Sequence, residues 1–313
     1  MTARKIIIDT DPGQDDAVAI LLALASPDEL DVVAITTVAG NVPLPLTTRN
    51  ALMMCELADR TDLPVYAGSV RPMVRDLVTA EYVHGVTGID GAGLPAPTME
   101  VREGHAVDAI VDIVMAAEPG EITICPLGPL TNIGKALVGE PRLADRIGEI
   151  ILMGGGFFEG GNVTPAAEFN IYVDPQAADI VFRSGIQITM MPLDVTHKAL
   201  TSPQRLARFA AIASPVGKAV HGMLDFFERF DIEKYGMEGG PLHDPCVIAY
   251  LLDPGLFGGK EVSVLIETSS EVTMGMTVVD WWGVTAESPN ATVMRHVDAE
   301  GFFELLADRI ARL

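Results

Sequence analysis

Residues 5–25 read KIIIDTDPGQDDAVAILLALA, and this stretch decides the fold. The isoleucine run at 6–8 predicts a short strand that is buried on both faces, as strands are inside a parallel sheet. The Pro-Gly pair at 12–13 predicts a tight turn, and the apolar spacing across 17–25 predicts a helix. A strand, an acidic turn and a helix in this order are typical of an α/β protein, whose ligand crevice lies at the carboxyl ends of the strands.

The acidic turn places four carboxylates, those of Asp9, Asp11, Asp15 and Asp16, within eight positions. One or two of them could simply cap the helix and shape the turn, because free N–H groups and the helix dipole favour carboxylates there. Four carboxylates beside a buried strand end repel one another, however, and their charged forms are costly unless a cation compensates. Since the ligand atoms are hard oxygens, we favour a site for Ca²⁺ or Mg²⁺ over one for zinc.

Composition and charge exclude several other classes of protein. The chain has 313 residues, of which 49% are hydrophobic and 20% charged, which indicates a globular protein. Its formal net charge of -22 argues against nonspecific binding to nucleic acid or to an anionic membrane surface. Three isolated cysteines, Cys55, Cys125 and Cys246, favour buried thiols in a reducing compartment. We therefore expect a cytoplasmic protein with neither a nucleic-acid nor a membrane partner.

The rest of the chain alternates between apolar runs and helical patterns, which predicts a mostly parallel central sheet flanked by helices in a single domain, residues 1–313. Residues 73–97 are rich in Gly, Pro and polar residues and are expected to form a long loop. The expected strands are 6–8, 31–38, 64–68, 121–125, 149–153 and 187–191, with late strands at 262–267 and 276–280 for which an antiparallel arrangement is left open. The expected helices are 17–25, 47–59, 106–117, 130–137, 175–184, two within 202–230, 243–252 and 301–312.

Several motifs at the predicted strand ends carry a resemblance that runs through nearly the whole chain. They are DTDPGQDD at 9–16, TTVAGN at 36–41, GPLTN at 128–132, MGGG at 153–156, NVTPAAEFN at 162–170, HDPC at 243–246 and GMTVVD at 275–280. In content and order these motifs resemble the inosine-uridine-type nucleoside hydrolases. The resemblance implies hydrolysis of the N-glycosidic bond of ribonucleosides to free base and ribose, on a nucleoside hydrolase fold.

The resemblance also implies a metal site. Asp11, Asp16 and Asp244 should bind one Ca²⁺ ion per subunit together with the backbone carbonyl of Leu127, a position where family members often have threonine. A bound cation would chelate the ribose diol and lower the pKa of a water molecule. Asp11, facing that water, is then the best candidate for the general base.

The sugar and the base are assigned in the same way. The residues that should hold the ribose are Asp15, Asn41, Met153, Asn162, Glu168 and Asn170, and carboxylates there would stabilise an oxocarbenium-like transition state. His243 should lie near the nucleobase, where it could donate a proton, and His84 and Tyr235 could line the same pocket. Tyr235 could equally pack against a neighbouring helix. We favour pyrimidine nucleosides such as uridine and cytidine, with a purine or broad inosine/uridine specificity left open.

Two other functions are compatible with parts of the sequence. Residues 9–11 (DTD) follow a strand, as in Mg²⁺-dependent phosphohydrolases, but that chemistry also needs a Lys or Arg for the phosphoryl charge, and lysines are sparse here. A non-catalytic nucleoside- or ribose-binding protein of the same fold is the second alternative. The resemblance further implies a homodimer or homotetramer.

Overall fold

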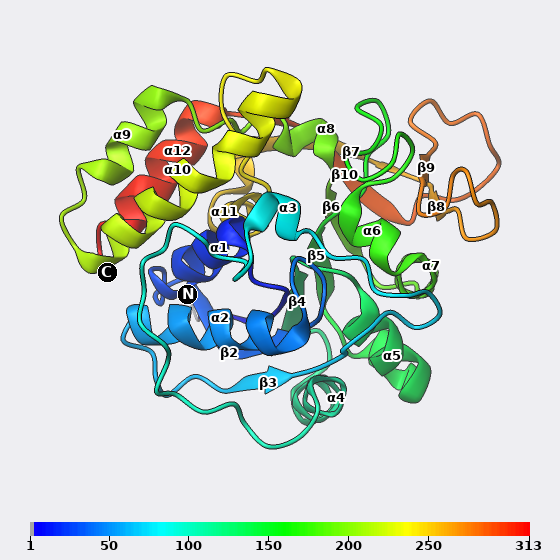
Figure 1. The fold of residues 1–313 in the computed structure, drawn as a ribbon. Coiled ribbons are helices and arrows are strands. Elements are labelled where there is room, and N and C mark those ends of the chain that lie inside the picture. Colours follow the sequence, from blue (N-terminus) through cyan, green and yellow to red (C-terminus); the bar gives the residue numbers. More distant parts are fainter. Residues whose placement is uncertain (1–2) are drawn as a thin grey trace.

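The first strand of the protein is buried on both faces, as its sequence predicts. The computed structural model describes residues 3–313, apart from the side chain of Tyr235. Strand β1 (Arg4–Thr10) lies between β2 and β4 in an eight-stranded sheet (Figure 1). Ile6 and Ile8 pack into one hydrophobic core and Ile7 into a second, on the opposite face. Successive side chains of a strand point to opposite faces, so the isoleucine run supplies both cores.

The central sheet is parallel except at one edge, where β7 pairs antiparallel with β10. Across the sheet the strands are β3 (Val65–Ala67), β2 (Leu30–Thr37), β1, β4 (Ile122–Pro126), β5 (Glu149–Met153), β6 (Ile188–Met191), β10 (Ala291–Val297) and β7 (Phe257–Val262). The predicted class, an α/β fold with a mostly parallel central sheet, is therefore confirmed.

Helices cover both faces of this sheet (Figure 1). One layer contains α1 (Gln14–Leu24), α2 (Leu44–Leu57), α10 (Pro215–Tyr235), α11 (Pro245–Leu252) and α12 (Ala299–Ile310), with α9 (Pro203–Ala210) against α10. The other contains α4 (Ala106–Ala116), α5 (Thr131–Gly139), α7 (Pro175–Phe182) and the short helix η1 (Pro141–Asp145). Three short helices, α3 (Glu81–His84), α6 (Phe169–Val173) and α8 (Leu193–Thr196), and η2 (Pro254–Leu256) complete the helical elements of the described residues. No helix among residues 3–313 combines the length and the apolar character that crossing a bilayer requires.

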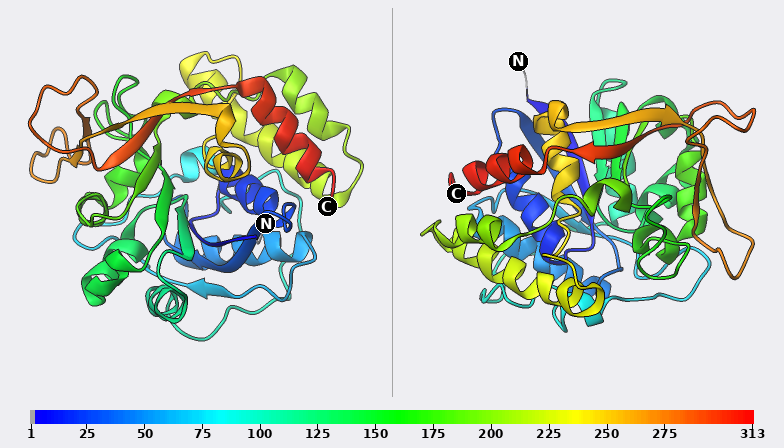
Figure 2. Two further views of the ribbon diagram at one scale, coloured as in Figure 1. Left: turned by 180° about the vertical axis from the view of Figure 1, so that it is seen from behind. Right: turned by 90° about the horizontal axis from the view of Figure 1, so that it is seen from above.

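The late part of the chain contains the two expected strands and further elements that the sequence did not predict. The segments expected as strands at 262–267 and 276–280 contain β8 (Val264–Ile266) and β9 (Thr277–Val279), which form a separate antiparallel pair. This pair and its loops project from the end of the molecule opposite α9 and α12 (Figure 2). The sequence did not predict β7 or β10, nor α3 within the expected loop 73–97.

The strand order reverses beside β1, and this reversal positions the site. From β1 the chain builds β2 and β3 on one side, whereas β4, β5 and β6 lie on the other. The carboxyl ends of β1 and β4 therefore open a crevice of the kind that binds ligands in α/β sheets. Asp11 follows β1 and Leu127 follows β4, so both lie at this opening.

Candidate active site

A cavity of about 290 Å³ lies at the carboxyl ends of the strands. Ten residues that the sequence assigned to the site line it: Asp15, Asn41, His84, Leu127, Met153, Asn162, Glu168, Asn170, His243 and Asp244. Asp11 and Asp16 do not line the cavity but adjoin these residues, and the side chain of Tyr235 lies outside the described part of the structure. The predicted convergence of distant motifs on one crevice is thus present in the structure.

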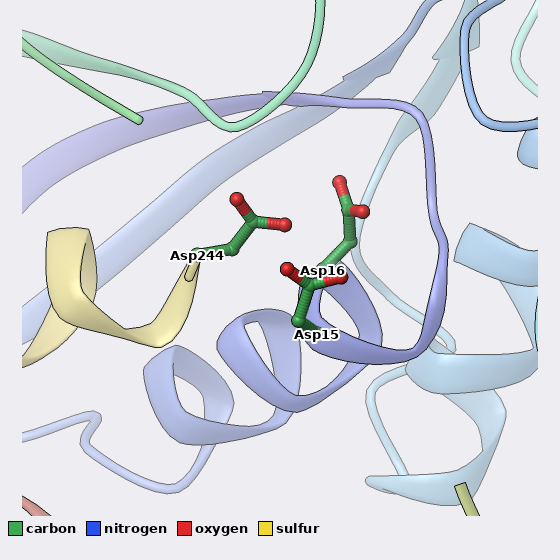
Figure 3. Close-up of side chains that lie close together, drawn as sticks. All are labelled: Asp15, Asp16 and Asp244. Atoms are coloured by element: carbon green, nitrogen blue, oxygen red, sulfur yellow. The ribbon is translucent and has the colours of Figure 1, made fainter. Parts of the chain in front are cut away.

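A cluster of buried carboxylates borders the cavity. Oxygen atoms of Asp15, Asp16 and Asp244 lie within 4.8 Å of one another, and Figure 3 shows the Asp244 carboxylate, at the start of α11, pointing toward the two at the start of α1. Burial, and then repulsion by Asp16, raise the pKa of Asp15 to about 8. Burial and neighbouring carboxylates also raise the pKa of Asp244 well above its usual range. Among the described lining residues there is no Lys or Arg to compensate these charges, so the donor set suits a hard cation.

The carboxylate of Asp11 is held in one position and leaves one oxygen free. Its Oδ2 accepts a hydrogen bond from the backbone N–H of Asn41 at 2.7 Å. Its Oδ1 is buried and has no hydrogen-bond partner. Gly40 and Gly128 press against this side chain, since a Cβ on either would lie 2.0 Å from Oδ2 or 2.1 Å from Oδ1 respectively. A buried oxygen without a partner is costly, and Asp11 Oδ1 therefore fits a site that receives a cation or a water molecule.

Asn41 and Asp16 connect the acidic turn to the loop after β2. The Nδ2 of Asn41 donates to the backbone carbonyl of Asp11 and to Oδ2 of Asp16, both at 3.1 Å. Asp16 also accepts from the backbone N–H of Gly13 at 3.0 Å. Because both amide hydrogens of Asn41 are engaged, its side-chain oxygen is the group left to accept from a ligand.

The opposite wall is built around the EFN segment. Glu168 precedes α6 and accepts from the backbone N–H groups of Gly155 and Asn170 at 2.9 and 2.8 Å. Burial nevertheless raises its pKa to about 7. The Nδ2 of Asn170 donates to the carbonyl of Leu127 at 2.7 Å and to that of Met153 at 3.3 Å. This network fixes the Leu127 carbonyl, which retains a second lone pair.

His84 is held by Gln14 from the DPGQDD motif. The Nε2 of Gln14 donates to the carbonyls of His84 and Asp90, at 2.9 and 3.2 Å, so its Oε1 must be the atom that faces His84 Nδ1 at 2.8 Å. His84 Nδ1 therefore carries a hydrogen. Burial lowers the pKa of His84 to about 3, so the ring is neutral and its Nε2 is an acceptor.

The sequence did not reveal three residues in or beside the cavity. Thr196 forms a hydrogen bond with His243, and His197 and Phe227 lie beside the His243 ring. Thr196 ends α8, His197 follows it, and Phe227 lies in α10. None of these segments carries a recognisable motif. Asn162 lines the cavity as expected, but its Oδ1 accepts from the backbone N–H of Phe169 at 2.9 Å, so it also braces the loop.

The fold and this site can be compared with known proteins. The sequence model of the inosine-uridine preferring nucleoside hydrolase family matches residues 6–304. The chain is 51% identical to the pyrimidine-specific ribonucleoside hydrolase RihA of Escherichia coli K12, over 98% of each chain. A plant nucleoside hydrolase structure is 36% identical, with a TM-score of 0.92 over 98% of this chain and 99% of that one. The purine-preferring ribonucleoside hydrolase of Gardnerella vaginalis is 33% identical, with a TM-score of 0.91 over 98% of each chain.

These matches define a hydrolase that acts on N-glycosidic bonds, built on the nucleoside hydrolase fold. The chain belongs to the inosine-uridine preferring nucleoside hydrolase family.

Proposed function

We propose that this enzyme hydrolyses pyrimidine ribonucleosides such as uridine and cytidine to the free base and ribose. The observation that carries the proposal is the partnerless Oδ1 of Asp11, beside a buried carboxylate cluster at a polar cavity. Such a site can activate water next to a sugar that develops positive charge as its bond to the base breaks.

The cluster is proposed to hold one Ca²⁺ ion per subunit. Asp11, Asp16 and Asp244 would supply carboxylate oxygens, and Leu127 its backbone carbonyl, which are the hard donors that Ca²⁺ prefers. When bound, the ion supplies a Lewis acid that chelates the ribose diol and lowers the pKa of a bound water. The partnerless Asp11 oxygen and the absence of compensating cations among the described lining residues support this assignment.

In the reaction, Asp11 acts as the general base. Its Oδ1 takes a proton from the water that attacks C1′. Because the water attacks directly, the configuration at C1′ is inverted and no covalent intermediate forms. Gly40 and Gly128 keep the carboxylate in place for this step.

The ribose is proposed to lie between the acidic turn and the EFN segment. Asp15 and Asn41 would hold the 2′-hydroxyl and the water, whereas Asn162, Glu168 and Asn170 would hold the 3′- and 5′-hydroxyls above Met153. These groups are buried or line the cavity. A 2′-deoxyriboside would leave them unpaired, so we expect it to be a poor substrate.

The base is proposed to lie near His243 and His84, with His243 as the hydrogen-bond donor to the leaving group and Tyr235 as a further contact. The identity to RihA, named as pyrimidine-specific, supports the pyrimidine preference. The purine-preferring relative of Gardnerella vaginalis supports the alternative of a purine or broad specificity.

A reducing-sugar assay tests the function. Uridine, cytidine, inosine and 2′-deoxyuridine are offered with Ca²⁺ or with a chelator to the wild type, to Asp11→Ala and to the matched control Asp28→Ala, whose side chain is exposed. We expect ribose release that the chelator abolishes, a loss on the order of 10³-fold in Asp11→Ala, and no loss in Asp28→Ala. Preserved turnover in Asp11→Ala would remove Asp11 from the mechanism.

The same assay separates the alternatives. Release of phosphate from a generic phosphate ester without release of ribose would favour a phosphohydrolase. Ca²⁺-dependent nucleoside binding without turnover would favour a binding protein.

Three wider assignments accompany this function. We infer that residues 1–313 act as one domain, since the central sheet combines eight strands drawn from residues as far apart as Arg4 and Val297. We propose a homodimer or homotetramer, which the mass in light scattering tests. We propose a cytoplasmic location, supported by three buried free cysteines.

A further inference from the structure

Among the described residues, the His243 ring forms one hydrogen bond, and its partner lies outside every recognised motif. Thr196 is fully buried and is the last residue of α8, the short helix that follows β6. Its Oγ1 lies 2.8 Å from Nδ1 of His243. Among the described residues, neither the Thr196 hydroxyl nor the His243 ring forms any other hydrogen bond.

The direction of this hydrogen bond follows from the surroundings of the hydroxyl. A threonine hydroxyl has a hydrogen to donate, and in the described structure Nδ1 is the acceptor within its reach. If Nδ1 carried the ring hydrogen instead, the hydroxyl hydrogen would be buried without an acceptor, which is costly. The hydroxyl therefore donates to Nδ1, and the single hydrogen of the neutral ring resides on Nε2.

The Nε2 of His243 faces the cavity. His243 lines the cavity, and no described group forms a hydrogen bond with its Nε2, which is also not among the buried atoms without a partner. Phe227 and His197 pack beside the ring, with centroids 6.5 and 5.9 Å away. The N–H is therefore available to a bound molecule.

Another histidine of the cavity, His84, has the opposite hydrogen-bonding polarity. Gln14 accepts from Nδ1 of His84, so Nε2 of His84 is an acceptor in the neutral ring. Of these two histidines, only His243 presents a hydrogen to the base.

We propose that Thr196 is a positioning residue that holds His243 in the Nε2–H tautomer, so that this N–H donates a hydrogen bond to the leaving base. The inference rests on the proposed function. As the bond from C1′ to the base nitrogen breaks, its electron pair moves onto the base, and the Nε2–H hydrogen bond stabilises the resulting negative charge. No proton leaves the ring, the attacking water supplies the oxygen at C1′, and the base then takes its proton from solvent water.

Two variants and two leaving groups test the proposal. Thr196→Val has nearly the same shape and lacks the hydroxyl, whereas Thr196→Ser keeps it and is the matched control. Uridine needs stabilisation of its leaving base, whereas 4-nitrophenyl riboside releases a stable anion without a donor. For Thr196→Val we expect a fall in kcat of about 100-fold on uridine, with KM unchanged and with 4-nitrophenyl riboside cleaved as by the wild type. Thr196→Ser should resemble the wild type on both substrates.

Nitrogen-15 NMR of histidine-labelled protein reads the tautomer directly. We expect His243 to carry its hydrogen on Nε2 in the wild type and in Thr196→Ser, and to become a mixture of tautomers in Thr196→Val. A hydrogen on Nδ1 in the wild type, an unchanged kcat in Thr196→Val, or an equal loss on both substrates would overturn the proposal. If Thr196→Val does not fold, the wild-type tautomer still decides. A wild type that cleaves no nucleoside would instead overturn the proposed function.

Discussion

At the scale of single residues, the site depends on glycines as much as on aspartates. The Asp11 carboxylate lies directly against Gly40 and Gly128, because a Cβ on these residues would lie only 2.0 and 2.1 Å from its oxygens. Neither glycine has a backbone conformation that requires glycine, since neither φ lies in the left-handed range. The TTVAGN and GPLTN motifs therefore contain glycine because of this close approach, which positions the proposed base.

Gly128→Ala tests this close approach. Its Cβ would lie 2.1 Å from Oδ1 of Asp11, so the carboxylate must move by an ångström or more, and we expect kcat to fall on the order of 100-fold. The control is Gly258→Ala on edge strand β7, where the nearest atom to the new Cβ is 3.5 Å away. Steady-state kinetics with uridine compare the two variants. Wild-type kcat in Gly128→Ala would show that the position of Asp11 is not critical.

Residues in contiguous motifs could be predicted from the sequence, whereas contacts between distant segments could not. Asp11 and Asp16 flank one turn, and the hydrogen bonds that Asp16 accepts from the backbone N–H groups of Asp11 and Gly13 follow from local spacing. Asp9, near the end of β1, accepts hydrogen bonds from the distant residues Thr36 and Asn132, which local spacing does not indicate. Thr196 and His243 likewise meet only because the strand that precedes α8 and the loop before α11 end at the same crevice. No local pattern encodes such a contact.

At the scale of elements, the strands that the sequence did not predict are also those that depend on contacts between distant segments. Strand β10 has the sequence ATVMRHV, in which exposed Arg295 and His296 interrupt the apolar run. It pairs with β6, about a hundred positions earlier, and with β7. Strand β1 was predictable because both its faces are buried and its sequence is continuously apolar, whereas β10 owes its conformation to its neighbours.

Helices α5 and α7 pack closely at a glycine, which gives a prediction for stability. A Cβ on Gly134 would lie 2.8 Å from Cβ and 2.9 Å from Cα of Ala177, so Gly134→Ala must push the helices apart. We expect a loss of about 1–3 kcal/mol in the free energy of unfolding, measured by urea denaturation. Neither helix lines the cavity, so kcat should be retained.

Gly139→Ala is the matched control for this prediction. It lies in the same helix, and its Cβ would meet no atom within 4 Å. Its stability should match or slightly exceed that of the wild type, since alanine favours helix. Equal stabilities of the two variants would contradict the packing argument.

At the scale of the whole molecule, we expect the buried carboxylate cluster to lower the stability of the fold unless a cation is bound. The carboxylates of Asp11, Asp15 and Asp244 are buried with raised pKa values, in a chain that already carries a net charge of -22. A ligand that binds only the folded state stabilises it by about 4 kcal/mol at a concentration 1,000 times its Kd. Thermal stability should therefore depend strongly on Ca²⁺.

Asp244→Asn should make this dependence visible, because the variant and the wild type should exchange their order in Tm when Ca²⁺ replaces the chelator. In chelator we expect its Tm to equal or exceed that of the wild type, because one repelling charge has been removed from the cluster. In Ca²⁺ we expect the wild type to gain several degrees and Asp244→Asn to gain little, so that the wild type becomes the more stable. Differential scanning fluorimetry with chelator, Ca²⁺ or Mg²⁺ measures all three conditions, with Asp28→Asn as the exposed control. A wild-type Tm that neither cation changes would refute the metal site, whereas a larger shift with Mg²⁺ than with Ca²⁺ would reassign the ion. If the order in Tm reverses for Asp244→Asn but not for Asp28→Asn, the carboxylates that destabilise the protein in chelator are those that bind the ion.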